Sequence, residues 1–335
     1  MLAKIVWQTK SPVVSECFNK KSITSIIKGG NSYNFYALTA LAQKFDVSID
    51  KNAIKNNDQS MVNYIYRNYN RYPKADVTIK ENYPLVACAI SKNSKNIAII
   101  HHVDEIHSGG TFGHKLFFKM LLNRLPKMDL VITVSEYWKN YLLEKGCKNV
   151  KVIYNSFNVE DYNITGDAKI AFRKKYNLSD RPVIYIGNAH RQKGVYEAYD
   201  ALKDIDAEFI MTGAKNMAPD IPVKFLSLDK HDFISLLHTS ELVVLMSKLN
   251  EGWNRVAHEA LLCKTPVIGS GSGGMHELLT KSNQVISDVK NLKENVIQVL
   301  KNRDRYIESG YKFAIQYDMN YFNTAWQTAV KNIIM

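Results

Sequence analysis

Two glutamates eight positions apart, Glu251 and Glu259, give the strongest chemical signal in this 335-residue sequence. Glu259 opens a run typical of a helix, 259–264, which is followed by an apolar run typical of a strand, 267–269, and by a glycine-rich turn, 270–274. Carboxylates accept hydrogen bonds from sugar hydroxyls, and backbone N–H groups at the start of a helix bind phosphate. The segment therefore predicts a site for a polyhydroxylated, phosphorylated ligand.

The order of these residues resembles the donor site of the retaining, nucleotide-sugar-dependent glycosyltransferases of the GT-B fold, the family 4 or group 1 glycosyltransferases. Members of that family read E-G-F/W-x5-E-A-x2-C/A-G-T-P-V, followed by a G-G pair and a further glutamate. In this chain the motif runs from Glu251 to Val267, and the pair Gly273–Gly274 and Glu277 follow. The chain departs from the pattern at Lys264, where a glycine is usual.

The resemblance assigns a role to each residue of this segment. Glu259 is expected to accept hydrogen bonds from the two ribose hydroxyls, because one carboxylate can accept two O–H donors. Its alternative role is that of an acidic residue at a helix N-terminus, where it would interact with the helix dipole. Arg255 could as easily face solvent. The remaining expected donor contacts are Glu251, the N–H groups of Gly252, Trp253 and Asn254, and Val256 beside the ribose.

A second element of the resemblance follows the apolar run 183–186. The family reads G-R-x4-K-G here, and its arginine and lysine hold the diphosphate; Lys193 and Gly194 match this pattern, whereas Asn188 replaces the arginine. An asparagine cannot neutralise an oxyanion, and a departing diphosphate must be stabilised. Arg191 is a candidate to supply the lost charge from another angle. The alternative is that Arg191 and Lys193 are solvated loop cations.

In the first half, Gly29 and Gly30 precede a run typical of a helix, 33–45. Glycines permit positive φ, so that consecutive N–H groups can face an anion, and the family carries a G-G pair at this place, near the diphosphate. After the strand-like run 97–100 comes His102, with His101 as the alternative register. Histidines at such strand ends lie where open α/β sheets bind ligands, and the resemblance places one near the transferred sugar.

Two further ideas concern the segment after that histidine. Asp104 and Glu105 are candidates for a base or an orienting group on the acceptor side. A zinc site built from His101, His102, Asp104 and His107 competes with this interpretation, but the sequence offers no further ligand cluster at suitable spacing. We therefore expect no metal and no cofactor other than the nucleoside-diphosphate sugar, which is a substrate.

Short apolar runs alternate with helical stretches along the whole chain, which favours parallel sheets covered on both faces. The predicted strands are 4–7, 47–49, 77–79, 85–89, 97–100, 130–134, 183–186, 208–212, 224–226, 242–246 and 266–268. Two such sets predict two Rossmann-like domains, 1–157 with 316–335 and 158–315. The resemblance implies that they face each other across a cleft, and that the amphipathic stretch 319–334 is a helix that crosses back to the first domain.

The charge is uneven: residues 1–166 hold 22 Lys and Arg against 13 Asp and Glu, whereas residues 167–335 hold 22 against 19. The basic first half suggests an anionic partner or simply a lysine-rich proteome. The stretch 113–127 is apolar and basic and suits peripheral binding to anionic lipid; its alternative is a core-facing helix. Four scattered cysteines and an N-terminus without the layout of a secretion signal favour the cytoplasm.

Three smaller features complete the prediction. Ser135 is expected to cap the helix that follows it. The nucleotide base is expected near 212–213 and 226–228. No G-x-G-x-x-G follows the first strand, which argues against a dinucleotide oxidoreductase, and no basic-aromatic surface indicates nucleic-acid binding.

The resemblance implies a two-domain α/β enzyme that moves a sugar, with retention and without a metal, from a nucleoside-diphosphate sugar to a glycan or lipid-linked acceptor. The expected setting is the assembly of a bacterial surface polysaccharide, such as lipopolysaccharide, at the cytoplasmic face of the membrane. The expected catalytic residues are His102, Lys193 and Glu251. The alternatives are a nucleotide-sugar epimerase of the same fold and, because of Asn188, a nucleotide-sugar-binding protein without transfer activity.

Overall fold

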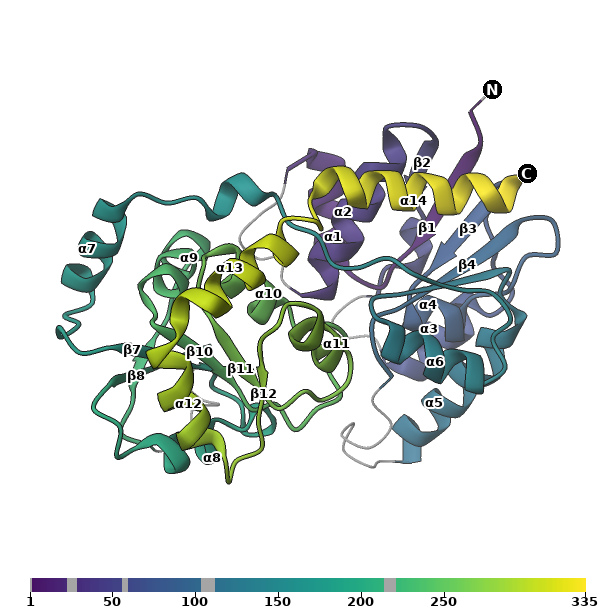
Figure 1. Ribbon diagram of the computed structural model, residues 1–335. Coiled ribbons are helices and arrows are strands. Elements are labelled where there is room, and N and C mark those ends of the chain that lie inside the picture. The colour runs from purple at the N-terminus through teal and green to yellow at the C-terminus, as the bar shows by residue number, and fades with distance from the viewer. Residues whose placement is uncertain (1, 23–28, 56–59, 104–111, 214–220) are drawn as a thin grey trace. The chain divides into compact units, whose positions relative to one another are not determined.

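The computed structural model of this protein describes residues 2–22, 29–55, 60–103, 112–213 and 221–335 (Figure 1). The chain divides into two compact units. The first comprises Met1–Ser156 together with Met319–Met335, and the second comprises Phe157–Asp318. The boundaries predicted from the sequence lay after residue 157 and before residue 316.

The first unit is built on a parallel sheet in the order β2-β1-β3-β4-β5-β6. Its strands are β1 (Lys4–Gln8), β2 (Asp46–Ile49), β3 (Val77–Lys80), β4 (Lys95–Ile100), β5 (Leu130–Thr133) and β6 (Val150–Val152). Its helices are α1 (Pro12–Lys20), α2 (Gly30–Ala42), α3 (Met61–Asn68), α4 (Asn82–Ala87), α5 (Phe112–Arg124), α6 (Glu136–Glu144) and α14 (Met319–Ile334), with 3-10 turns η1 (Lys51–Ala53) and η2 (Leu125–Lys127).

Strand order fixes which helices share a face of this sheet. The chain leaves β1 toward β2 and later returns to β3 on the opposite side of β1. Because parallel crossovers are right-handed, connections that run in opposite directions lie on opposite faces. Accordingly α1, α2 and α14 lie together, and α3, α4 and α5 lie together (Figure 1).

Helix α14 brings the C-terminal part of the chain back to the first unit, as the resemblance implied. Its buried residues Phe322, Trp326, Ala329 and Val330 recur with helical spacing. The indole of Trp326 lies 5.9 Å from that of Trp7 on β1, measured between ring centroids. The side chain of Gln327 donates a 2.8 Å hydrogen bond to the carbonyl of Ala40 at the end of α2.

The second unit contains a parallel sheet in the order β12-β11-β10-β7-β8-β9. Its strands are β7 (Val183–Asn188), β8 (Glu208–Thr212), β9 (Lys224–Leu226), β10 (Leu242–Leu245), β11 (Val267–Gly269) and β12 (Val285–Ile286). Its helices are α7 (Gly166–Lys175), α8 (Val195–Leu202), α9 (Lys230–Thr239), α10 (Arg255–Leu262), α11 (Gly274–Lys281), α12 (Leu292–Lys301) and α13 (Arg303–Ala314), with 3-10 turns η3 (Val159–Tyr162) and η4 (Arg191–Lys193).

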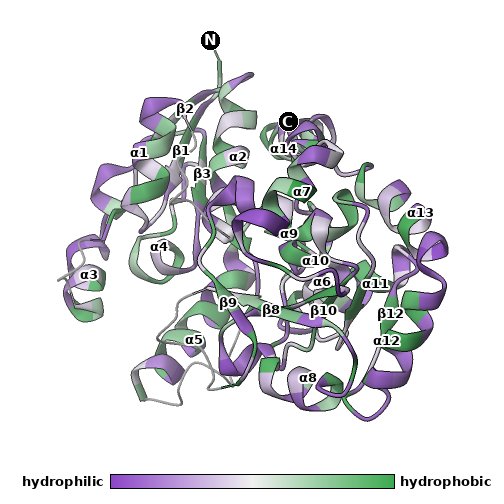
Figure 2. Ribbon diagram, turned by 90° about the vertical axis from the view of Figure 1, so that its left-hand side faces the viewer, coloured by the Kyte–Doolittle hydropathy of each residue, from purple (hydrophilic) through white to green (hydrophobic). Residues whose placement is uncertain are grey.

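The core of the second unit is apolar on both faces of the sheet. Strands β8 and β10 are buried along their whole length. The helices bury one side only: α12 buries Leu292, Val296 and Val299, and its hydrophobic and hydrophilic sides are visible in Figure 2. This pattern is what parallel sheets with helices on both faces require.

Two predicted elements differ from the structure, and two of its strands are missing from the prediction. The run 85–89 is not a strand, because α4 covers Asn82–Ala87. A short run that is apolar throughout has no periodicity to separate a buried strand from a buried helix. Two strands were not predicted, β6 and β12, since each is a short strand at a sheet edge. Helix α2 begins at Gly30 and ends at Ala42, three residues earlier at each end than predicted.

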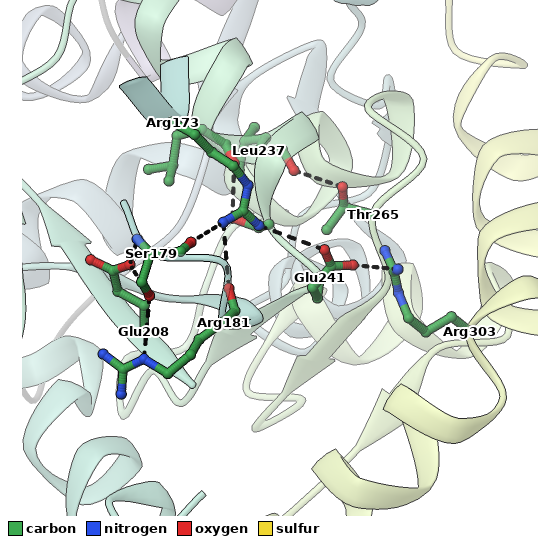
Figure 3. Close-up of polar contacts among 10 residues, drawn as sticks. Arg173, Ser179, Arg181, Glu208, Leu237, Glu241, Thr265 and Arg303 are labelled. Atoms are coloured by element: carbon green, nitrogen blue, oxygen red, sulfur yellow. Dashed lines mark hydrogen bonds and ion pairs between the residues drawn. The ribbon is translucent and has the colours of Figure 1, made fainter. Parts of the chain in front are cut away.

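A polar cluster closes the amino-terminal edge of the second sheet (Figure 3). Arg173 donates to the carbonyls of Ser179, at 2.5 Å, and Arg181, at 3.4 Å, and it lies 3.9 Å from the carboxylate of Glu241. Arg303 of α13 pairs with the same carboxylate. These contacts tie α7 and α13 to the starts of the strands.

Candidate functional site

The strand order of the second unit indicates where a ligand would bind. Strand β7 has β8 on one side and β10 on the other, so the winding direction reverses between β7 and β10. Open α/β sheets bind ligands outside the carboxyl ends of the strands at such a reversal. Lys193 follows β7 and Glu251 follows β10, which places both predicted residues at this point.

Lys193 and Glu251 contact each other directly. The Lys193 ammonium lies 2.6 Å from a Glu251 carboxylate oxygen, and the two side chains are 34% and 14% exposed. The turn that carries Lys193 requires a glycine next, because Gly194 has φ 69° and a Cβ there would lie 1.9 Å from the carbonyl oxygen of Met246. The loop after β7 thus packs against the end of β10.

The glycine-rich turn after β11 holds the backbone of Glu251. The Glu251 N–H donates to the carbonyl of Ser272 at 3.3 Å, and the Gly274 N–H donates to the carbonyl of Glu251 at 2.8 Å. Gly273 has φ 64°, and a Cβ on it would lie 2.5 Å from the Glu251 carbonyl oxygen. Any larger residue would therefore separate the Glu251 loop from the start of α11.

Glu259 lies in the second turn of α10, because the helix begins at Arg255 and not at Glu259 as the sequence suggested. This rules out the alternative in which Glu259 is a first-turn charge. Its carboxylate accepts a 3.0 Å hydrogen bond from the Tyr162 hydroxyl and lies 3.8 Å from the Arg255 guanidinium. Burial raises the pKa of Glu259, against the opposing effect of Arg255. Arg255 itself lies over the ring of Phe157, at 4.4 Å, and does not simply face solvent.

Trp253 has a structural side chain. Its indole N–H donates a 3.1 Å hydrogen bond to Nδ1 of His258, and Nε2 of His258 faces the carbonyl of Ala314 at 3.1 Å. Burial lowers the pKa of His258 to about 3, so this ring is neutral and links the Glu251 loop to the end of α13. The Trp253 side chain is thus engaged inside the protein, and the ligand contacts predicted for the backbone N–H groups of Gly252, Trp253 and Asn254 stay a prediction. Asn254 also caps α10, where its side chain accepts from Ala257 N–H at 3.0 Å.

The remaining predicted donor residues lie nearby on the same unit. Asn188 is exposed at the end of β7, and a Cβ on Gly213 would lie 1.8 Å from its side-chain oxygen. Val256 is half-buried in the first turn of α10. Arg191 is exposed in η4. Burial opposes the ionisation of Glu197 in α8, but Lys248 and, more weakly, Arg191 lower its pKa, so part of the charge of Arg191 acts on Glu197.

In the first unit the structure brings His101, rather than His102, to the predicted glycine pair. A Cβ on Gly30 would lie 3.1 Å from the His101 ring, and the ring packs edge-on against Tyr33 with 4.9 Å between centroids. The adjacent His102 is exposed. Gly29 has φ 57° and is the N-cap of α2, as a glycine turn at a helix start requires. Asp104, Glu105 and His107 lie outside the described residues.

Sequence reasoning missed a buried polar pair at the carboxyl end of β3. Lys80 is fully buried, and its ammonium donates to the side-chain oxygen of Gln8, the last residue of β1. Burial lowers the pKa of Lys80 to about 8 and raises the pKa of the neighbouring Glu81 to about 7. The only indication of this site in the sequence is that Lys80 and Glu81 follow the apolar run 77–79 directly. In this sheet too, β1 and β3 flank the reversal of winding direction.

Other predicted features have clear places. Ser135 caps α6, where its hydroxyl accepts from Trp138 N–H at 3.5 Å.

In α5 and η2, Leu121 and Leu125 are buried, whereas Phe112 is 82% and Leu116 47% exposed. Within the described ranges, no helix is long and apolar enough to cross a bilayer. In the same ranges, no three His, Cys, Asp or Glu side chains are grouped as metal ligands would be.

The match to a family model lies in the second unit. Residues 168–313 match the family model described as glycosyl transferases group 1. The chain is 27% identical over 256 residues to an uncharacterised glycosyltransferase of Methanocaldococcus jannaschii, which covers 71% of this chain and 66% of that protein. It is 25% identical over 199 residues to the O-antigen chain mannosyltransferase RfbU of Salmonella typhimurium, covering 54% and 53%. The matches thus span half to two thirds of these relatives.

Solved structures share the fold of the whole chain. Sucrose-phosphate synthase of Thermosynechococcus elongatus superposes with a TM-score of 0.77 at 14% identity, over 99% of both chains. HepE of Anabaena, in complex with UDP-glucose, gives 0.71 at 18% identity, over 98% of this chain and 100% of that one. With its two six-stranded parallel sheets and returning C-terminal helix, this chain has the GT-B fold.

Proposed function

We propose that this chain, whose residues 168–313 match the model of the group 1 glycosyltransferases, transfers a sugar from a nucleoside-diphosphate sugar to a glycan or lipid-linked acceptor. The observation that carries the proposal is the Lys193–Glu251 pair, which lies at the reversal point of the second sheet. It combines a cation for phosphate with a carboxylate for sugar hydroxyls at one place.

The proposed reaction breaks the bond between the anomeric carbon and the diphosphate oxygen and forms a bond from that carbon to an acceptor hydroxyl oxygen. The hydroxyl proton passes to an oxygen of the departing diphosphate, and the acceptor attacks from the same face, so that the configuration is retained. The protein then needs no nucleophile and no metal. Its contribution is a fixed cation and fixed backbone dipoles directed at the charge that develops on the leaving group.

Individual residues have separate tasks in this proposal. Lys193 and the helix N-terminus that follows Gly194 stabilise the diphosphate, and Glu259 accepts from the ribose. Glu251, together with the N–H groups of residues 252–254, contacts the donor sugar. Because Glu251 already positions the Lys193 ammonium, one carboxylate would connect sugar recognition to phosphate recognition.

A thermal-shift screen against UDP-, GDP-, ADP- and TDP-sugars tests donor binding. A ligand at 100 times its dissociation constant should stabilise the protein by about 2.7 kcal/mol. We expect Glu259→Ala to abolish the shift and Lys193→Ala to reduce it. The matched control is Lys203→Ala, since Lys203 is also ion-paired, to Asp200 at 2.7 Å, but follows the C-terminus of α8. If the two site variants bind every donor as the parent does, the assignment is wrong.

Turnover separates the proposed reaction from its alternatives. A transferase releases nucleoside diphosphate when acceptor is added, an epimerase interconverts donor sugars without acceptor, and a binding protein does neither. Activity that survives EDTA would support the metal-independent course. A bacterial surface polysaccharide or lipopolysaccharide as product is supported by the similarity to the O-antigen chain mannosyltransferase RfbU.

We also propose that the first unit associates peripherally with the cytoplasmic face of the membrane through α5. Phe112 and Leu116 are exposed on this helix beside the exposed cations Lys115 and Lys119. Apolar side chains flanked by lysines suit an anionic bilayer surface. Co-sedimentation with vesicles that contain phosphatidylglycerol should be lost in Phe112→Ser/Leu116→Ser, and vesicles of phosphatidylcholine alone should bind weakly.

A further inference from the structure

One buried imidazole on α10 connects the Glu251 loop to the end of α13. The indole N–H of Trp253 donates a 3.1 Å hydrogen bond to Nδ1 of His258. On the other side of the ring, Nε2 lies 3.1 Å from the carbonyl oxygen of Ala314, the last residue of α13. The ring and both of its partners are buried. Since Trp253 lies two residues after Glu251, the imidazole holds this loop from inside the second unit.

The two partners determine where the proton of His258 lies. An indole N–H can only donate and a carbonyl oxygen can only accept, so Nδ1 is unprotonated and Nε2 carries the proton. A protonated ring would be a donor at both nitrogens, and one of its N–H groups would be directed at the indole N–H. The ring is therefore neutral, in the Nε2–H form, and each of its nitrogens has a partner.

The hydrogen bond between Trp253 and His258 closes an unusual turn. Between the two residues, Asn254 has φ 69°, a left-handed conformation that asparagine tolerates better than most residues do. The Asn254 side chain accepts from Ala257 N–H at 3.0 Å, and its carbonyl accepts from His258 N–H at 3.3 Å, so that α10 begins directly after the turn. The turn thereby brings the indole of Trp253 onto an imidazole five residues further along the chain.

The ring of His258 is fixed by its neighbours as well as by hydrogen bonds. Its centroid lies 4.6 Å from that of Phe157 and 6.0 Å from that of Tyr317. Helix α13, which supplies the carbonyl, packs closely on α10, because a Cβ on Gly310 would lie 2.7 Å from a side-chain carbon of Leu261. The imidazole is thus anchored to α13 and is a fixed support for the loop.

We propose that His258 is a positioning residue of the donor site: through Nδ1 and the indole of Trp253 it holds the Glu251 loop, so that the carboxylate of Glu251 meets the donor sugar. This inference rests on the proposed glycosyltransferase activity and deepens it, because it adds a buried residue that does not touch the substrate. The loop of Lys193 is held separately, by the close contact of Gly194 with the end of β10. Loss of the imidazole contact should therefore weaken recognition of the sugar and spare recognition of the diphosphate.

Two amide substitutions separate the two hydrogen bonds of the ring. His258→Asn places its side-chain oxygen near the position of Nδ1 and keeps an acceptor for Trp253. His258→Gln places its side-chain nitrogen near the position of the ring Nε2 and keeps only the donor to Ala314. We expect the asparagine variant to resemble the parent at the donor site and the glutamine variant to have a loosened Glu251 loop. Val299→Ala, at a buried position of α12, is the control for a loss of stability alone.

NMR spectra of ¹⁵N-labelled protein at pH 7 test the contact without a ligand. Long-range ¹H–¹⁵N correlation should show the pattern of an Nε2–H ring for the signal that both His258 variants lack. The indole N–H of Trp253, assigned with Trp253→Phe, should exchange slowly with solvent in the parent, in His258→Asn and in Val299→Ala. In His258→Gln it should exchange about tenfold faster, the effect of one lost hydrogen bond.

Calorimetric titration tests the effect on donor recognition, with UDP-glucose and UDP, GDP-mannose and GDP, ADP-glucose and ADP, and TDP-glucose and TDP as probe pairs. In His258→Gln the affinity for the sugar nucleotide should fall about tenfold, and the affinity for the free diphosphate should stay within about threefold. His258→Asn should keep both affinities within about threefold of the parent, and this rescue separates positioning from a general loss of stability. Adding Glu251→Gln to His258→Gln should cost little more, because both changes disable one contact.

Distinct outcomes overturn distinct claims. An Nδ1–H ring in the parent, or equal indole exchange in the asparagine and glutamine variants, overturns the support of the loop by His258. Faster exchange in His258→Gln with an unchanged ratio of the two affinities overturns its role in sugar recognition. The expected spectra in a protein that binds none of the probes overturn the proposed function and leave the support of the loop intact. If His258→Gln does not fold, Trp253→Phe, which lacks the indole N–H, carries the same comparison of affinities.

Discussion

The ammonium of Lys193 lies 2.6 Å from the carboxylate of Glu251, which joins the loops that follow two neighbouring strands, β7 and β10. Neither loop is positioned by this pair alone, since Gly194 and Gly273 allow close backbone contact on both sides. The pair therefore lies on a rigid support, and substitutions in it should affect ligand recognition more than folding.

Glu251→Gln should separate recognition of sugar from recognition of diphosphate. Loss of the carboxylate removes a charge-assisted hydrogen bond to the sugar, worth about 1.5–3 kcal/mol, or roughly tenfold to a hundredfold in affinity. Free nucleoside diphosphate should still bind within about threefold of the parent, because Lys193 remains. Calorimetric titration with each ligand measures both values. Equal losses for the two ligands would contradict the division of tasks.

Asn188→Arg should strengthen binding of the diphosphate. Asn188 is exposed at the end of β7, where the family pattern has a cation, and a bidentate arginine–phosphate contact should gain about tenfold in affinity, or about 1.4 kcal/mol. Asn188→Gln is the control, since it adds length without charge. If the arginine and glutamine variants bind nucleoside diphosphate alike, Arg191 already supplies the charge or the position does not face phosphate.

Glu81 should make the stability of the protein depend on pH. Burial raises its pKa from 4.5 to about 7, so between these values the folded chain holds a proton that the unfolded chain has lost. The free energy of unfolding therefore falls as the pH rises, by about 3 kcal/mol over this window. Glu81→Gln lacks this contribution. The free energy of unfolding of parent and variant is measured with urea at pH 4.5 and pH 7.5. The excess of the parent over the variant should be smaller at pH 7.5 by that amount.

Glu208→Gln is the control for this pH dependence. Burial opposes the ionisation of Glu208, but Lys224 and Ser179 outweigh it and lower the pKa. A lowered pKa contributes stability above about pH 4.5 that is lost in more acid solution. The difference between the parent and Glu208→Gln should thus be constant between pH 4.5 and 7.5. A difference for Glu81→Gln that is also constant would mean that Glu81 is ionised throughout.

Trp326→Ala should destabilise the first unit by about 3–5 kcal/mol, the usual cost of removing a fully buried tryptophan. The ring packs on Trp7 and Tyr33, at 5.9 and 6.1 Å between centroids. Trp326→Phe preserves an aromatic contact and should cost less. Urea unfolding monitored by fluorescence measures both. Donor binding by the second unit should persist in both variants, and its loss would indicate that the effect is not confined to the first unit.

Much of the fold is visible in the sequence because its strands are buried on both sides. Strands β8 and β9 occupy the very residues predicted, although a short apolar run does not by itself distinguish a buried strand from a buried helix. The run at 85–89 had the same composition but forms α4, where Pro84 and the following residues are buried against other helices. Burial was predicted correctly there, and the backbone conformation was not.

Prediction of the candidate site depended on spacing along the chain. Glu251 and Gly273 lie in one segment of the sequence, so a sequence motif could indicate that their backbones are in contact. No motif could indicate the contacts of Glu81 with Trp7 and Thr9, or that of His101 with Asn34, because these residues are far apart in the sequence and meet only in three dimensions.

The return of α14 has a consequence for how the protein is made. Trp7 can pack against Trp326 only after the chain between them has been synthesised. At the usual synthesis rate of 5–20 residues per second, this takes the ribosome roughly 15 to 60 s. The second unit is continuous in sequence and can fold during that interval. During this time the nascent first unit exposes Tyr33 and Trp7, so it is the part of the nascent chain that we expect chaperones to bind.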